Sequence, residues 1–134
     1  MIRFIETIRI ADGVADNLEY HRKRYNHTIR HHYQNIDSDD FILYISGVLN
    51  KERMIISKGL FKLRVTYTNK PLSYTLEPYY AKEIRSLRLV ENNGVDYSFK
   101  YENRSAIEAL FPFRGDCDDI LIVKNGYITD TSYC

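Results

Sequence analysis

Lys100 is the residue whose type and setting most directly suggest chemistry. It stands in VDYSFKYENRSAIEALF, Val95 to Phe111, where a strand-like alternation gives way to the expected first turn of a helix. The exposed N–H groups at a helix start carry partial positive charge, which disfavours a nearby ammonium and is expected to lower the pKa of the lysine. A neutral amine is a nucleophile that can form a Schiff base with an aldehyde cofactor. Spacing alone does not separate this chemistry from an ordinary surface lysine.

Histidines and basic residues crowd the segment between His21 and His32. His27 and His31 stand four residues apart, so on a helix both side chains share one face and could bind a metal ion. No carboxylate or cysteine stands at a spacing that supplies a third ligand. The sequence therefore favours a solvated helix face and predicts no metal site.

A nucleic-acid role for the same segment is a further alternative. Four Lys or Arg residues fall within residues 22–30, a local basic patch that could contact phosphates. Across the chain, however, 19 basic residues stand against 18 acidic ones, and the formal net charge is +1. This balance gives no general attraction to nucleic acid or to an acidic membrane, so we expect neither partner.

Cysteine usage and the apolar runs indicate the compartment. Cys117 and Cys134 are too few for a disulfide framework, and acidic residues flank Cys117, which makes it a poor nucleophile candidate. No apolar run approaches the roughly 20 residues of a membrane helix, and the N-terminus lacks the apolar core of a signal peptide. We therefore expect a cytoplasmic protein.

Two helices are expected in residues 1–82, the predicted small N-terminal α/β lobe. One helix spans Leu18 to Tyr33, with Asn17 as a possible N-cap. The second lies in IDSDDFILYISGVL, which opens with Asp and Ser capping residues and is then apolar nearly all round. We expect this helix to be buried and to end near Gly47, with a surface loop at residues 50–58.

Strand patterns surround these helices. The stretch IRFIETIRI opens the chain as a strand, and GLFKLRVTYT and LSYTLEPYY predict a hairpin, because the Asn and Pro between them suit a tight turn. The charged AKEIRS at residues 81–86 is the candidate lobe boundary, since the strand LRLVEN begins directly after it.

Residues 83–134 are predicted to begin a larger C-terminal lobe. Ser105 and Glu108 form a capping-box pattern before a short helix, which Pro112 and Gly115 end. The strongest local signal is DDILIVKNGYITDT, where alternating apolar residues flank Asn-Gly, the preferred dipeptide of a type I′ hairpin turn. Together these elements predict an α+β fold of two lobes.

Four segments, in order, resemble those of the class IV (fold-type IV) pyridoxal-phosphate enzymes. FIETIRI is similar to the opening strand of that family, and EYHRKR to its H-x-x-R helix motif. FKYENRSAIEAL resembles the lysine segment, and GYITDTSYC resembles the G-x-(V/I)-x-E hairpin. This family contains branched-chain and D-amino-acid aminotransferases and aminodeoxychorismate lyase. The resemblance implies a two-lobe D-amino-acid-aminotransferase-like fold with its C-terminal lobe incomplete.

The resemblance assigns roles to four residues. Lys100 would form the internal aldimine with pyridoxal 5′-phosphate and then move the α-proton. Arg24 would bind the cofactor phosphate, with which a guanidinium pairs bidentately. Asp130 falls where the family carries a glutamate beside the pyridine nitrogen, and Arg64 aligns with a basic position near the substrate carboxylate.

The expected substrate is a small amino-acid-like or aminochorismate-like molecule. The K-x-x-N-R run from Lys100 to Arg104 and the short N-terminus favour a 4-amino-4-deoxychorismate lyase over a branched-chain aminotransferase. Lyase and aminotransferase remain open, because they share their early steps on the cofactor. We also expect a homodimer, because the strand edges left by an incomplete lobe favour self-association.

Two departures from the family pattern support a rival interpretation. Asp130 is one methylene shorter than glutamate and reaches roughly 1.5 Å less far, enough to break a hydrogen bond. The chain also ends one residue before the position of a family asparagine, and before the segments that donate backbone N–H groups to the phosphate. The alternative is therefore a non-catalytic or truncated remnant of the fold that acts as a binding protein.

Overall fold

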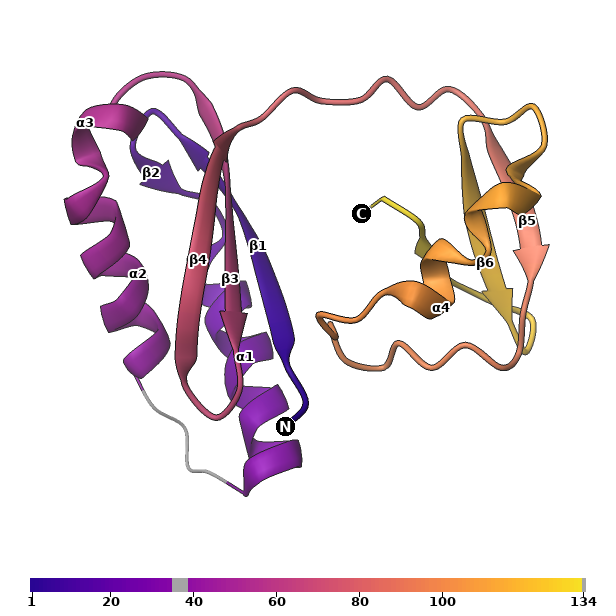
Figure 1. Cartoon of the computed structure of the whole chain (residues 1–134), viewed down its shortest axis with the longest axis horizontal. Helices are drawn as coiled ribbons and strands as arrows, with labels where there is room; N and C mark the ends of the chain where they lie inside the picture. The colour runs from indigo at the N-terminus through magenta and orange to yellow at the C-terminus, as the bar shows by residue number, and fades with distance from the viewer. Residues whose placement is uncertain (35–38, 134) are drawn as a thin grey trace. The chain divides into compact units, whose positions relative to one another are not determined.

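The computed structural model describes residues 1–34 and 39–133, and they divide into two units (Figure 1). Unit 1 contains Met1–Tyr80 together with Phe99–Glu102, and unit 2 contains Ala81–Ser98 together with Asn103–Cys134. The first long segment ends at Tyr80, and the lobe boundary is predicted after residue 82. Phe99–Glu102, which lie in the range predicted for the second lobe, group with unit 1.

Unit 1 is built on a four-stranded antiparallel sheet. Its spatial order is β2-β1-β3-β4. The strands are β1 (Phe4–Ala11), β2 (Val14–Ala15), β3 (Leu60–Tyr67) and β4 (Pro71–Pro78). The predicted hairpin is confirmed, since β3 and β4 pair directly in antiparallel register.

Three helices accompany this sheet. They are α1 (Leu18–Tyr33), α2 (Asp40–Lys51) and α3 (Arg53–Ile56). The core joins the apolar face of β1 and β3 to α1, α2 and α3. Its buried members are Phe4, Ile8, Ile10, Tyr25, Ile29, Phe41, Ile45, Val48, Ile56, Leu63, Val65 and Tyr67.

The predictions for the first two helices need correction in detail. Asn17 is the N-cap of α1, but it caps through its left-handed backbone, with φ of 54°, and not through a side-chain hydrogen bond. Helix α2 does not end near Gly47 and is not buried all round, because Leu43 is 68% exposed. A glycine inside a helix costs only about 1 kcal/mol relative to alanine, so α2 continues through Gly47 to Lys51. The α3 turn replaces part of the expected loop, and the proposed caps at 37 and 38 lie outside the described residues.

Unit 2 contains a smaller sheet of three strands, in the order β5-β6-β7. Strand β5 (Leu87–Glu91) runs parallel to β6 (Asp119–Lys124), and β6 is antiparallel to β7 (Tyr127–Thr131). The predicted type I′ turn is confirmed, because Asn125 and Gly126 have φ of 51° and 81°.

The helical part of unit 2 is short. Helix α4 (Ser105–Glu108) is a single turn, and a 3-10 turn, η1 (Phe111–Arg114), follows it. The predicted capping box is wrong, because Ser105 is already the first helical residue and the N-cap is Arg104, which makes no side-chain cap. Asn103 instead accepts a hydrogen bond from the Ser105 backbone N–H at 3.0 Å.

The core of unit 2 is correspondingly small. It buries Ile107, Leu110, Ile120 and Ile122, with Val90, Val95 and Tyr97 packed against them. The two units together confirm the expected α+β class. In the described residues, no helix combines the length and apolar character that crossing a membrane requires.

Candidate functional site

The backbone around Lys100 is held against the start of β1. Phe4 and Tyr101 form an isolated antiparallel bridge, and the Ile5 N–H donates to the Lys100 carbonyl at 2.9 Å. The Tyr101 N–H donates to the Phe99 carbonyl, also at 2.9 Å, so Lys100 is the central residue of a three-residue turn. The strand expected before Lys100 is absent from the described residues. Hydrogen bonds nevertheless fix the backbone of Lys100, and the residue is half-buried.

Aromatic rings on both sides of Lys100 anchor this turn in unit 1. The Phe99 ring lies 5.6 Å from His27 and 4.8 Å from His31, centroid to centroid, and Tyr101 packs 5.3 Å from Phe4. His27 and His31 are therefore part of a packing surface for Phe99. In the part of the chain that the structure describes, no group of three metal-binding side chains occurs.

The reason first given for a neutral Lys100 amine is not supported. It required a helix start, but α4 has only four residues, so few peptide dipoles align in it. Residues 99–102 also belong to unit 1, whereas α4 belongs to unit 2. A role for Lys100 must therefore rest on its fixed turn and on its relatives, not on a helix dipole.

Arg24 lies in α1 and pairs with Glu6 in β1. Its Nε donates to Glu6 Oε1 at 2.7 Å, and its Nη2 donates to Glu6 Oε2 at 2.5 Å, which together form a bidentate fork. His21 Nδ1 lies 2.6 Å from Glu6 Oε2. The Glu6 side chain is fully buried, whereas that of Arg24 is 44% exposed, so one side of the pair reaches solvent.

Electrostatics keep Glu6 ionised in this setting. Burial alone raises the pKa of Glu6, but hydrogen bonds from Arg24 and then His21 outweigh it, so the pKa lies below its ordinary value of 4.5. Tyr67, which also faces this cluster from β3, has its hydroxyl pKa raised, chiefly by burial. The cluster therefore carries a persistent buried carboxylate that holds a partly exposed guanidinium.

Arg64 lies on the sheet face away from the helices. It pairs with Thr7 of β1, and its neighbours along β3, Leu63 and Val65, point to the buried core instead. The guanidinium is half-buried and makes no hydrogen bond or ion pair within the described part of the chain. A cation of this kind is suited to receive a ligand carboxylate.

Asp130 belongs to unit 2, whereas the other three predicted residues belong to unit 1. It is part of β7, is half-buried, and its carboxylate makes no hydrogen bond or ion pair with any described residue. Lys100, Arg24 and Arg64 are thus all in unit 1, but Arg64 lies on the opposite sheet face from Glu6, the partner of Arg24.

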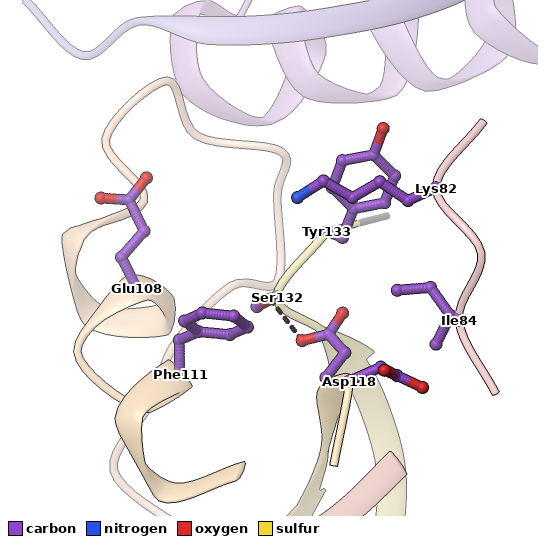
Figure 2. Close-up of a pocket in the computed structure, with 8 residues that line it drawn as sticks. Lys82, Ile84, Glu108, Phe111, Asp118, Ser132 and Tyr133 are labelled. Carbon is purple, nitrogen blue, oxygen red and sulfur yellow. Dashed lines mark hydrogen bonds between the residues drawn. The ribbon is translucent and has the colours of Figure 1, made fainter. Parts of the chain in front are cut away.

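A pocket of about 260 Å³ in unit 2 contains none of these residues (Figure 2). It is lined by Lys82, Ile84, Glu108, Phe111, Asp118, Asp119, Ser132 and Tyr133. The buried Asp119 carboxylate accepts hydrogen bonds from the Ser132 hydroxyl and from the Ile120 N–H. These bonds stabilise the fold of unit 2. Asp118 in turn accepts from the Arg85 and Ser86 N–H groups, which lowers the pKa of its carboxyl.

Glu6 was missed in the sequence, although a signal for it was present. In FIETIRI the alternating positions Phe4, Ile8 and Ile10 form an apolar face, and Glu6 is a charged residue on that same face. Charged side chains are seldom fully buried unless they are paired. A glutamate in this register therefore indicates a cationic partner on the helix that covers the strand.

Comparison with known proteins finds relatives that match nearly the whole chain. An uncharacterized protein of Haemophilus influenzae is 32% identical over 132 residues, which cover 98% of this chain and 69% of that protein. A solved structure from Haemophilus somnus, assigned as a 4-amino-4-deoxychorismate lyase, matches with a TM-score of 0.79 and 28% identity, covering 98% of this chain and 68% of the other.

A more distant neighbour shares the fold with a bound cofactor. The PLP-bound form of a protein from Mycobacterium tuberculosis, described as an aminotransferase, matches with a TM-score of 0.72 and 18% identity. That match covers 98% of this chain and 55% of the other. No family model matches the chain.

Proposed function

Since this chain belongs to the fold-type IV family of pyridoxal-phosphate enzymes, which includes 4-amino-4-deoxychorismate lyases and aminotransferases, we propose that it binds pyridoxal 5′-phosphate through Lys100. We propose further that it acts on an amino-acid-like or aminochorismate-like substrate. Lys100 would then be the catalytic residue: its amine would hold the cofactor at the aldehyde carbon, with release of water, and would carry the α-proton of the substrate.

The donor groups of the chain fit this cofactor chemically. Arg24 supplies a guanidinium for the phosphate, and its side chain is accessible to solvent while Glu6 holds it from the buried side. Asp130 supplies a half-buried carboxylate for the protonated ring nitrogen. Arg64 supplies a second guanidinium for the substrate carboxylate. When bound, the cofactor acts as an electron sink for the bonds at the substrate α-carbon.

The single observation that carries the proposal is the content of unit 1. Among its basic residues, this unit holds Lys100 in a turn fixed by hydrogen bonds, Arg24 oriented by a buried carboxylate, and the half-buried Arg64. An amino-acid substrate bound to a phosphate-bearing aldehyde requires these groups: an amine, a phosphate anchor and a carboxylate anchor.

We favour a lyase-like activity over amino transfer. The K-x-x-N-R run at residues 100–104 resembles the lyases, and the Haemophilus somnus protein that supports this reading is assigned as one. A lyase cleaves its substrate with no acceptor present, whereas an aminotransferase needs a keto acid to receive the amino group. Turnover with and without an added keto acid therefore separates the two activities.

The rival function is a non-catalytic binding protein with the same fold. It is favoured by the Arg24–Glu6 fork, which also explains Arg24 as a structural link between α1 and β1. The short side chain of Asp130 favours it as well, because a weak contact with the ring nitrogen would weaken the electron sink.

We also propose that the chain forms a homodimer. Strands β5 and β7 are the edges of the unit 2 sheet, and they expose large apolar side chains, with Leu89 65%, Tyr127 76% and Ile128 67% exposed. Edge strands with exposed apolar side chains tend to associate. Light scattering on the purified chain should give twice the monomer mass of 15.9 kDa, and a monomer at all concentrations would refute this.

The test of the cofactor assignment is covalent trapping. The chain is incubated with pyridoxal 5′-phosphate, reduced with borohydride and digested, and the modified peptide is identified by its mass. We expect the label on Lys100, and we expect Lys100→Ala to lose the visible absorbance band of the complex. Lys58→Ala, which removes an exposed lysine of unit 1, is the matched control and should keep both. A band that persists in Lys100→Ala would refute the assignment.

A further inference from the structure

Glu6 is an unusual residue in its place on β1. Strand alternation puts it on the same face as Phe4 and Ile8, which are fully buried in the apolar core. A buried carboxylate is costly unless charge-assisted hydrogen bonds compensate it. Arg24 and His21 supply these hydrogen bonds, so a paired carboxylate is accommodated within an otherwise apolar face.

The geometry of the pair determines how Arg24 is presented. A free arginine side chain samples many rotamers, and it loses that freedom when it binds an anion. The fork from Nε and Nη2 to both carboxylate oxygens of Glu6 fixes the plane of the guanidinium before any ligand arrives. Because Glu6 lies on the buried side and Arg24 is 44% exposed, the fork faces inward and the side chain still reaches solvent.

A second fork on the same helix provides an internal comparison. Arg22 donates through Nε and Nη2 to Glu19 at 2.9 and 2.8 Å, with the same two nitrogens. The Glu19 side chain is 55% exposed, so it is free to move with its partner. Of these two forks, the one to Glu6 has a buried carboxylate fixed on β1. That fork can therefore hold its arginine in a fixed direction.

We propose that Glu6 is a positioning residue, which orients the Arg24 guanidinium so that it is ready to bind the phosphate group of the cofactor. This inference rests on the proposed function, since it takes Arg24 as the phosphate ligand. It assigns no chemical step to Glu6. The carboxylate remains in place on the buried side, and binding requires no reordering of the arginine.

The charge of Glu6 and its positioning of Arg24 have opposite effects on the affinity for phosphate. The test therefore needs a substitution that keeps the charge. Removing the Glu6 charge would strengthen the attraction of Arg24 for phosphate, while losing the fork would weaken binding. Glu6→Asp keeps the charge but shortens the side chain by about 1.5 Å, so it breaks the fork and the contact with His21 without removing the carboxylate. Glu19→Asp makes the same change at the exposed fork and is the matched control.

The experiment compares two ligands that differ only in the phosphate. Spectroscopic titration measures the affinity of each variant for pyridoxal 5′-phosphate and for pyridoxal. We expect Glu6→Asp to weaken pyridoxal 5′-phosphate binding about tenfold, the cost of immobilising one arginine on binding, and to leave pyridoxal binding unchanged. Glu19→Asp should change neither affinity.

The outcomes separate this inference from the proposed function. If Arg24→Ala weakens pyridoxal 5′-phosphate binding but folded Glu6→Asp does not, Glu6 has no positioning role and the inference alone is overturned. If neither variant weakens it, the assignment of Arg24 to the phosphate also falls. An equal loss for both ligands would mean a general structural effect and would overturn the inference.

A measurement on the wild-type chain covers the case in which Glu6→Asp does not fold. Nitrogen NMR resolves the two Nη nuclei of an arginine when rotation about its Nε–Cζ bond is slow. We expect slow rotation for Arg24 without ligand and fast rotation for Arg53, which is exposed and makes no hydrogen bond or ion pair among the described residues. Fast rotation at Arg24 would overturn the inference.

Discussion

Replacing Glu6 by glutamine should destabilise the chain in a pH-dependent way. The carboxylate accepts two bonds from Arg24 and faces His21, and a charge-assisted hydrogen bond contributes about 1 kcal/mol more than a neutral one. The two bonds from Arg24 therefore give a loss of about 2 kcal/mol near pH 7. The loss stays below the 3–5 kcal/mol typical of a broken buried pair, because water can solvate the 44% exposed Arg24.

The sign of the pH dependence follows from the lowered pKa of Glu6. A carboxyl whose folded-state pKa is depressed stabilises the fold above its unfolded value, here about 4.5, and loses that contribution as the pH falls through the folded-state pKa. The stability gap between wild type and Glu6→Gln should therefore be constant near neutral pH and shrink in acid. His21, Arg24 and Tyr67 are the other ionisable groups that face position 6, and all three are present in both proteins.

The assay is urea-induced unfolding followed by circular dichroism, repeated from about pH 7 down to about pH 3. The control is Glu19→Gln, which removes an exposed fork on the same helix and should change stability little at any pH. A gap that is absent at neutral pH, or one that stays constant into acid, would contradict the account of Glu6 as an ionised buried partner of Arg24.

Three further predictions concern other parts of the chain. Gly126→Ala should cost about 1 kcal/mol in thermal unfolding, because φ is +81° and a Cβ added there would meet no non-neighbouring atom within 4 Å, so that backbone strain is the whole effect. An unchanged melting temperature would contradict the type I′ turn. Ile107→Ala should cost about 2–4 kcal/mol and disorder unit 2 first, because it removes one of four buried core residues; equal loss of NMR signals from both units would argue against separate cores. Asp118→Asn should lower the hydrogen-exchange protection of the Ser86 amide, and in the wild type that protection should fall in acid, because the pKa of Asp118 is lowered by the N–H groups it accepts from. Protection that is the same in Asp118→Asn as in the wild type would show that another group holds this segment.

Local patterns in the sequence predicted several elements well, and the reason is their short range. The Asn125-Gly126 turn is determined by two residues that tolerate positive φ, and the flanking alternation then sets the hairpin. The β3–β4 hairpin was predictable on the same basis. Where a helix terminus depended on competing local signals, prediction failed, as for the end of α2 at Lys51 and for the cap of α4.

The candidate site was only partly predictable. Lys100, Arg24, Arg64 and Asp130 were identified from motifs that resemble a family, and their assigned roles remain proposals. Their grouping could not be read from the motifs, because it depends on contacts between residues far apart in the chain. Residues 99–102 pair with the start of β1, almost a hundred positions earlier, and this pairing puts Lys100 in unit 1.

The sequence alone determined the elements with strong local signals, the α+β class and the family resemblance, because periodicity, turn chemistry and motif spacing act within a few residues. The tertiary structure decided which side chains meet. It buried Glu6 beneath α1, turned Arg24 onto it as a fork, and fixed Lys100 between two aromatic anchors. Burial and charge pairing depend on which strand and helix pack together, and no local window of residues contains that information.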